Sequence, residues 1–96
     1  MFEWDESKNQ ANLEKHRISF EAAKEIFNGP VLTRRDNRQD YGEGRFTSLG
    51  AIDGEIVIFV AHTDRENRTR IISARKASRK EREVYYDHFK ETLGRD

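Results

Sequence analysis

Arg70 and Arg75 are the residues of this chain best suited by type to hold a phosphate group. A guanidinium is a planar fork of N–H donors that grips phosphate or carboxylate with paired hydrogen bonds. Residues five apart face opposite sides of a regular strand, so the two arginines share a face only if a β-bulge lies between them. In the alternative interpretation both are structural and pair with carboxylates such as Glu43 or Glu81.

The segment around these arginines is the basic part of a balanced chain. Eighteen Lys and Arg balance eighteen Asp and Glu over 96 residues, but Arg65 to Arg82 holds eight basic residues and two acidic ones. Such a segment attracts phosphates within about 10 Å, or else forms a solvated face. Arg79 and Lys80 in this segment, together with Arg45, are candidates to hold an RNA backbone.

A second candidate group lies near the N-terminus. Lys8, Asn12, Lys15 and His16 have the spacing i, i+4, i+7 and i+8, which places them on one helix face. Either this face is solvated, or it borders a groove in which phosphates or bases lie. In the second case Lys8 and Lys15 bind the backbone and His16 acts as a base.

Two further side chains are candidates for proton transfer. His62 ends the most apolar segment of the chain and is an alternative general base, and Tyr85 or Lys15 is a candidate acid. A lone histidine is more often structural than catalytic. Tyr85 also belongs to an apolar stripe, which favours a place in the core.

Several classes of protein are excluded by composition. The chain has no cysteine and its three histidines are far apart, so it offers no metal-ligand spacing and we expect neither a metal nor another cofactor. No apolar run approaches about 18 residues, and the N-terminus has no basic or apolar leader. We therefore expect a cytoplasmic protein without a membrane partner.

The pattern of the chain predicts one α+β domain over residues 1–96. It consists of two N-terminal helices, an antiparallel sheet of about four strands and a C-terminal helix. Phe2 to Trp4 is a possible edge strand. The helices are expected over Glu6–His16, from Ser19 to Gly29, and from Ser78 to about Leu93; the strands are expected over Val31–Arg35, Arg45–Ala51, Glu55–His62 and Thr69–Lys76.

Caps and turns support these boundaries. Asp5 and Ser19 are typical N-caps, and Ser78 with Glu81 forms a capping-box pattern. Asp53-Gly54 predicts a tight hairpin. Tyr41 to Gly44 indicates a looser connection.

Three motifs resemble those of the BrnT toxin family, and together they span nearly the whole chain. The opening motif is Trp4-Asp5 with Lys8, Asn12, Lys15-His16, Phe20 and Ala23; the central one is Gly42-Glu43-x-Arg45; and the last is Arg70-Ile71-Ile72-Ser73-Ala74-Arg75-x-Ala77 with Glu81 and Tyr85. The last motif is specific, whereas the central one is weak alone. One position departs from the family, because Arg17 follows Lys-His where glycine is usual.

This resemblance implies a RelE/ParE-like fold and a metal-independent endoribonuclease that arrests translation and growth. It also implies a BrnA-type antitoxin that neutralises the toxin. The toxin would contact operator DNA only through this antitoxin. The alternative is a non-catalytic module that binds RNA or protein, or an inactive toxin homologue. Our central hypothesis is that cations of the last strand and of the opening helix converge around one phosphodiester.

Overall fold

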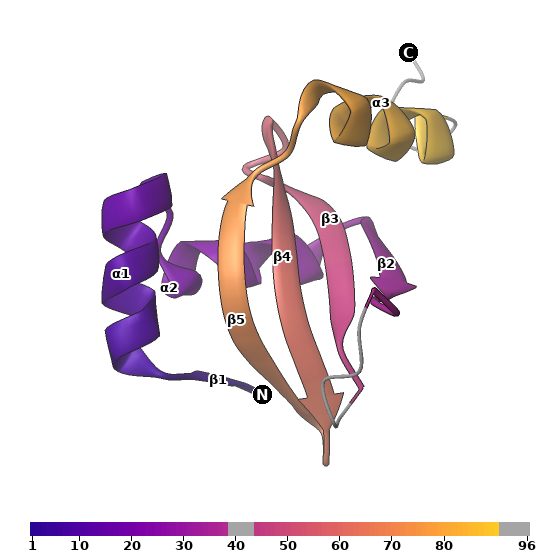
Figure 1. The fold of residues 1–96 in the computed structure, drawn as a ribbon. Coiled ribbons are helices and arrows are strands. Elements are labelled where there is room, and N and C mark those ends of the chain that lie inside the picture. The colour runs from indigo at the N-terminus through magenta and orange to yellow at the C-terminus, as the bar shows by residue number, and fades with distance from the viewer. Residues whose placement is uncertain (39–43, 91–96) are drawn as a thin grey trace.

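A computed structural model describes residues 1–38 and 44–90. The elements in chain order are β1 (Phe2–Trp4), α1 (Glu6–His16), α2 (Phe20–Ala23), the 3₁₀ helix η1 (Lys24–Asn28), β2 (Val31–Arg35), β3 (Phe46–Ile52), β4 (Ile56–Arg65), β5 (Arg68–Lys76) and α3 (Arg79–His88). The strands form one sheet in the order β1-β5-β4-β3-β2 (Figure 1). The α+β class predicted from the sequence is confirmed.

The sheet has five strands and is mixed, so the prediction of four antiparallel strands is wrong in detail. β1 pairs in parallel with β5, with Glu3 opposite Arg70. This short segment becomes a true strand because Phe2 and Trp4 pack against the core, while its backbone extends the sheet.

Helices cover the two faces of the sheet unequally. α1, α2 and η1 lie on one side, and α3 lies across one end of the other side (Figure 1). The first side buries a large core that includes Ile18, Phe20, Ala23, Ile26, Ile58, Val60, Ile71 and Ala74. Under α3 is a smaller core built from Leu49, Val57, Ala77 and Tyr85. Beyond α3, part of this second side is free of helices, and we call it the open face.

The second helix is shorter than expected. Ser19 is its N-cap as predicted, because the hydroxyl accepts from the N–H of Ala22, but the α-helix ends at Ala23 and continues as η1. η1 approaches β3 so closely that a Cβ on Gly50 would lie 2.6 Å from Cβ of Ile26. Glycine at this position therefore lets Ile26 enter the core.

The two long hairpins have short turns, of three residues between β3 and β4 and of two residues between β4 and β5. Asp53 and Gly54 have φ of 55° and 70°, as the Asp-Gly signal predicts. Glu66 and Asn67 also have positive φ, so a link that the sequence predicted to be longer is a tight turn between extended strands. The expected connection from Tyr41 to Gly44 falls largely outside the described residues.

The last helix begins as predicted. The hydroxyl of Ser78 accepts from the N–H of Glu81, and the carboxylate of Glu81 accepts from the N–H of Ser78, which completes a capping box. α3 ends at His88, and Leu93, where the sequence predicted its end, lies outside the described residues. Among the helices that the structure describes, none is long and apolar enough to cross a membrane.

Candidate phosphate-binding face

A β-bulge brings Arg70 and Arg75 onto the same side of β5. Ser73 pairs with Ala61 and Ile71 pairs with His62, which leaves Ile72 as an extra residue between them. The bulge shifts the alternation by one position, so that Ile71 and Ala74 both enter the large core although they are three residues apart. Arg70 and Arg75 consequently both face away from that core.

Arg75 is held in one orientation by three contacts. Its Nη1 and Nη2 atoms donate to the two carboxylate oxygens of Glu81, at 2.9 and 3.0 Å, and Nη1 also donates to the carbonyl of Lys76. The guanidinium carbon lies 4.1 Å from the centre of the Phe59 ring. Hydrogen bonding to Arg75 holds the pKa of the Glu81 carboxyl below its ordinary value. The ion pair with a carboxylate that the sequence allowed for Arg75 is therefore present.

Arg75 keeps a second edge for another anion. A guanidinium carries five N–H groups, and the contacts with Glu81 and Lys76 use its Nη atoms. In the described ranges the Nε–H group has no recorded partner. Glu81 thus fixes the plane of the guanidinium and leaves the Nε edge available to a phosphate.

Arg70 is more loosely held than Arg75. Its Nη1 lies 3.7 Å from a carboxylate oxygen of Glu3 on β1, and Arg68 approaches the same carboxylate at 3.5 Å. The Arg70 side chain is 46% exposed. Exposed ion pairs of this kind contribute little to stability, so Arg70 can turn toward a ligand at small cost. Glu43, the other candidate partner, lies outside the described residues.

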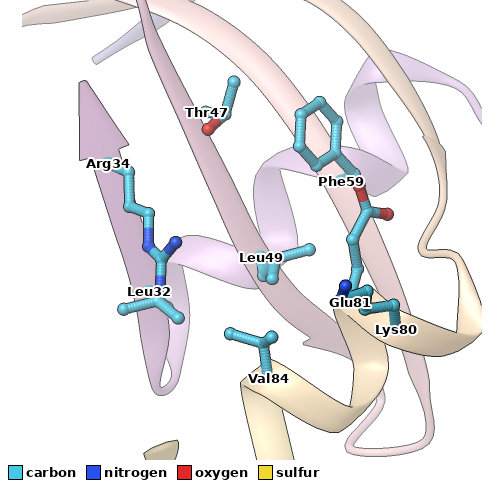
Figure 2. Close-up of a pocket in the computed structure, with 8 residues that line it drawn as sticks. All are labelled: Leu32, Arg34, Thr47, Leu49, Phe59, Lys80, Glu81 and Val84. Atoms are coloured by element: carbon cyan, nitrogen blue, oxygen red, sulfur yellow. The ribbon is translucent and has the colours of Figure 1, made fainter. Parts of the chain in front are cut away.

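A pocket of about 280 Å³ opens on the same side of the sheet. Its apolar wall is formed by Leu32, Leu49, Phe59 and Val84, and its polar groups belong to Arg34, Thr47, Lys80 and Glu81. Figure 2 shows Arg34 on the β2 side, Lys80 and Glu81 on the α3 side, and Leu49 between them. Since Phe59 and Glu81 also contact Arg75, the pocket and the arginine are neighbours.

The remaining predicted backbone-binding residues have different surroundings. Lys80 is exposed at the first turn of α3 and lines the pocket. Arg79 is 86% exposed and lies 3.4 Å from Glu83. Arg45 is half-buried just before β3.

The opening helix is not brought into contact with the two arginines. Asn12, in the middle of the polar stripe, is buried and bonds the backbone of Ala74 at the edge of β5, at 2.8 and 3.1 Å. Lys8 and Lys15 are exposed and His16 is half-buried. Through the described residues, no recorded contact joins these three side chains to Arg70 or Arg75, so the expected convergence is not observed. The reason is that α1 packs against the edge of β5 and against α2.

His62 lies in the protein interior. The residue is 1% exposed, and its ring contacts Phe27 and Phe46 on the side covered by helices. Nδ1 lies 2.8 Å from the Asp64 carboxylate and therefore carries a proton, and Nε2 lies 2.7 Å from Oγ of Ser48. Serine, histidine and carboxylate are joined in the order used by nucleophilic serines, but Ser48 is fully buried. This set is a structural network.

Tyr85 is also placed in a core. The residue is 1% exposed, and its hydroxyl donates to the carbonyl of Pro30 at 2.9 Å. Burial raises the pKa of the phenol, so the group stays protonated at neutral pH. With its donor occupied by Pro30, the hydroxyl is poorly placed to give a proton to a substrate on the open face.

The sequence patterns did not single out the pocket residues of β2 and β3. Leu32 on β2 pairs with Leu49 on β3, and Arg34 pairs with Thr47. Each strand therefore contributes one apolar and one polar side chain to the pocket. The alternation along β2 was readable. The register of β2 against β3 could not be predicted, because a long connection joins the two strands.

No three His, Asp or Glu side chains gather into a metal-binding group within residues 1–38 and 44–90. The described site is instead a face of positioned cations on a mixed sheet, beside a pocket capped by a helix N-terminus. An arrangement of this class is suited to hold a phosphodiester chain.

The comparisons with known proteins identify the family. The family described as "Ribonuclease toxin, BrnT, of type II toxin-antitoxin system" matches residues 4–81. The crystal structure of the Brucella abortus ribonuclease toxin BrnT is similar to this chain, with a TM-score of 0.63 and 28% sequence identity; the match covers 82% of this chain and 99% of that one. No curated protein matches the sequence. The chain belongs to the BrnT family of ribonuclease toxins, and this type II membership implies an antitoxin partner.

Proposed function

We propose that this chain is a metal-independent endoribonuclease that cleaves RNA on the open face and thereby inhibits translation and growth. The observation that carries the proposal is the bulge at Ile72, which directs Arg70 and Arg75 to one side of β5. Family membership supplies the ribonuclease class, and the two arginines supply phosphate-binding groups that match it.

Cleavage without a metal requires cations around the phosphate. The 2′-hydroxyl of RNA attacks the adjacent phosphorus, and the crowded anionic intermediate needs positioned donors. Arg75 offers its Nε edge in an orientation fixed by Glu81, and Arg70 adds a more mobile guanidinium. Lys80, Arg79 and Arg45 hold the flanking backbone. The products are a 2′,3′-cyclic phosphate and a 5′-hydroxyl end.

Proton transfer is assigned by access to solvent. His16, half-buried at the end of α1, is preferred to the buried His62 as the base. Lys15 is preferred to Tyr85 as the acid because the Tyr85 hydroxyl already bonds Pro30. In this scheme Lys8 and Lys15 guide the strand, and the RNA bends toward His16, because Asn12 anchors α1 to β5.

The partner is proposed to be a BrnA-type antitoxin. It covers the toxin and stops cleavage, and the pair binds operator DNA through the antitoxin. Induction of this chain alone is expected to halt growth, and induction together with the adjacent antitoxin gene is expected to restore it.

Purified protein incubated with RNA in EDTA tests the activity directly. We expect cleavage with 5′-hydroxyl ends, and no cleavage when the 2′-hydroxyl at the site is methylated. If the unmodified RNA also stays intact, the result would contradict the proposal and favour a module that binds RNA or protein without cleaving RNA.

Single arginine variants test the site. Arg75→Ala is expected to lower the cleavage rate about a hundredfold, which is typical for loss of one positioned donor, and Arg70→Ala is expected to lower it less. Arg35→Ala is the matched control, because Arg35 pairs with Phe46 on the side of the sheet covered by helices. Equal rates for Arg75→Ala and the control would remove Arg75 from the mechanism.

A further inference from the structure

The pocket beside Arg75 is not used by the chemistry described so far. It has a volume of about 280 Å³ and draws side chains from β2, β3, β4 and α3. That volume is just below the usual range for small-molecule sites, about 300–1,000 Å³, so it suits a single ring system. Leu32, Leu49 and Val84 give it apolar surface for the faces of a planar ring.

Its position next to Arg75 limits what the ring belongs to. Phe59 and Glu81 line the pocket, and both contact the Arg75 guanidinium. A phosphate bound by Arg75 lies beside these two residues, within reach of a nucleoside that enters the pocket. Lys80, at the rim, adds a second cation for the strand. This step rests on the proposed function.

The polar groups of the pocket favour one base. Glu81 is already engaged by Arg75 and Ser78, and of the two cations that line the pocket, Arg34 and Lys80, only Arg34 carries a planar fork of donors. An arginine fork donates to two acceptors side by side, and guanine presents such a pair at O6 and N7. Adenine places an amino donor next to N7 and would oppose the guanidinium.

We propose that this pocket binds a guanine base of the nucleotide whose phosphate lies on Arg75, with Arg34 donating to O6 and N7. The open face thereby reads one base while its arginines act on the backbone. Thr47, also in the pocket wall, offers a hydroxyl to the same base.

Cleavage of matched oligonucleotides tests the reading of the base. Four substrates differ only at the base beside the scissile phosphate, and the guanine substrate is expected to be cleaved about tenfold faster. Arg34→Ala is expected to erase this preference, and Arg35→Ala, one residue along β2 on the other side of the sheet, is expected to keep it. Equal preference in both variants would overturn the inference while leaving the nuclease intact.

A binding measurement separates this inference from the proposed function. Guanosine 3′-monophosphate is titrated into the protein and followed by NMR, with adenosine 3′-monophosphate as the control. We expect shifts at Thr47 and Val84 with the guanine nucleotide, reduced by Arg34→Ala and by Val84→Phe, which fills the pocket. Circular dichroism verifies that both variants fold.

Each result decides the matter. Guanine-specific shifts in a protein that cleaves no RNA would support guanine binding in the pocket and refute the proposed ribonuclease activity. Identical shifts with both nucleotides would refute the pocket. Loss of antitoxin binding in Val84→Phe with unchanged base preference would also refute it and would assign the pocket to a protein segment.

Discussion

The side chain of Asn12 takes the place of a strand beside Ala74. Its amide nitrogen donates to the carbonyl of Ala74 at 2.8 Å, and its oxygen accepts from the N–H of Ala74 at 3.1 Å. The pairs of β1 with β5 end at Ile71, so Asn12 satisfies the edge of β5 where β1 no longer reaches it. The same nitrogen donates to the carbonyl of Ile18, which ties the end of α1 to the start of α2.

We expect Asn12→Ala to destabilise the protein strongly. The substitution leaves one buried N–H and two carbonyls without partners, and each such group costs about 1–3 kcal/mol. A total loss of about 3 kcal/mol is expected in urea unfolding. Asn28→Ala is the control, because Asn28 is exposed and its side chain donates to the nearby Glu25. A loss below about 1 kcal/mol for Asn12→Ala would show that water replaces the amide.

This contact explains why the position of the polar stripe on α1 could not be predicted from the sequence. Spacing alone placed Asn12 on one face with Lys8 and Lys15, and that placement is a property of any helix. Which face meets the sheet depended on the free backbone edge of β5, which exists only because β1 is short. No local pattern in the sequence contains that information.

Arg17 adopts a left-handed conformation, with φ of 63°, and its N–H donates to the carbonyl of Leu13. This is the position at which the resemblance led us to expect glycine. A left-handed conformation costs a residue with a Cβ about 1–2 kcal/mol. We therefore expect Arg17→Gly to raise the free energy of unfolding by about 1 kcal/mol, measured by urea denaturation.

Lys15→Gly serves as the comparison for this substitution. Lys15 is an exposed helical residue two positions earlier, where glycine lowers stability by about 1 kcal/mol. Opposite signs for the two variants would attribute the gain to the backbone conformation. Destabilisation by both would show that the Arg17 side chain stabilises this end of α1.

The bulge in β5 shows where prediction of the site succeeded and where it stopped. The sequence allowed two outcomes for Arg70 and Arg75, and only a bulge put them on one face. The choice is made by packing, because Ile71 and Ala74 both fill the large core. The caps at Asp5, Ser19 and Ser78 were predictable because each depends on residues within one helical turn.

Tyr85→Phe distinguishes a structural phenol from a catalytic one. The variant loses the hydrogen bond to Pro30 and is expected to lose about 1 kcal/mol of stability in thermal unfolding. Because the hydroxyl bonds Pro30 in the smaller core under α3, the RNA cleavage rate is expected to stay within about twofold of that of the parent protein. A much larger fall in rate, in a variant that remains folded, would return Tyr85 to the role of general acid.

The pair of Arg75 with Glu81 predicts a specific response to acid. Hydrogen bonding to Arg75 lowers the pKa of the folded Glu81 carboxyl below its ordinary value of 4.5. The stabilisation from this group is therefore fully present above pH 4.5 and is lost as the pH falls through the lower, folded value. We expect Glu81→Gln to be less stable than the parent protein at pH 7, and we expect the difference to shrink toward pH 3.

Unfolding in urea across this range measures the effect. The carboxyl groups of Asp5 and Glu6 also have lowered pKa values, through hydrogen bonds with Ser7 and Gln10 respectively, but both groups are present in both proteins and their effects cancel in the difference. Glu83→Gln is the control, because the Glu83 side chain is 67% exposed and forms an exposed ion pair with Arg79 one turn away. Its stability is expected to run parallel to that of the parent protein. If the difference in unfolding free energy between Glu81→Gln and the parent protein stays constant from pH 7 to pH 3, the negative charge of Glu81 does not stabilise its pair with Arg75.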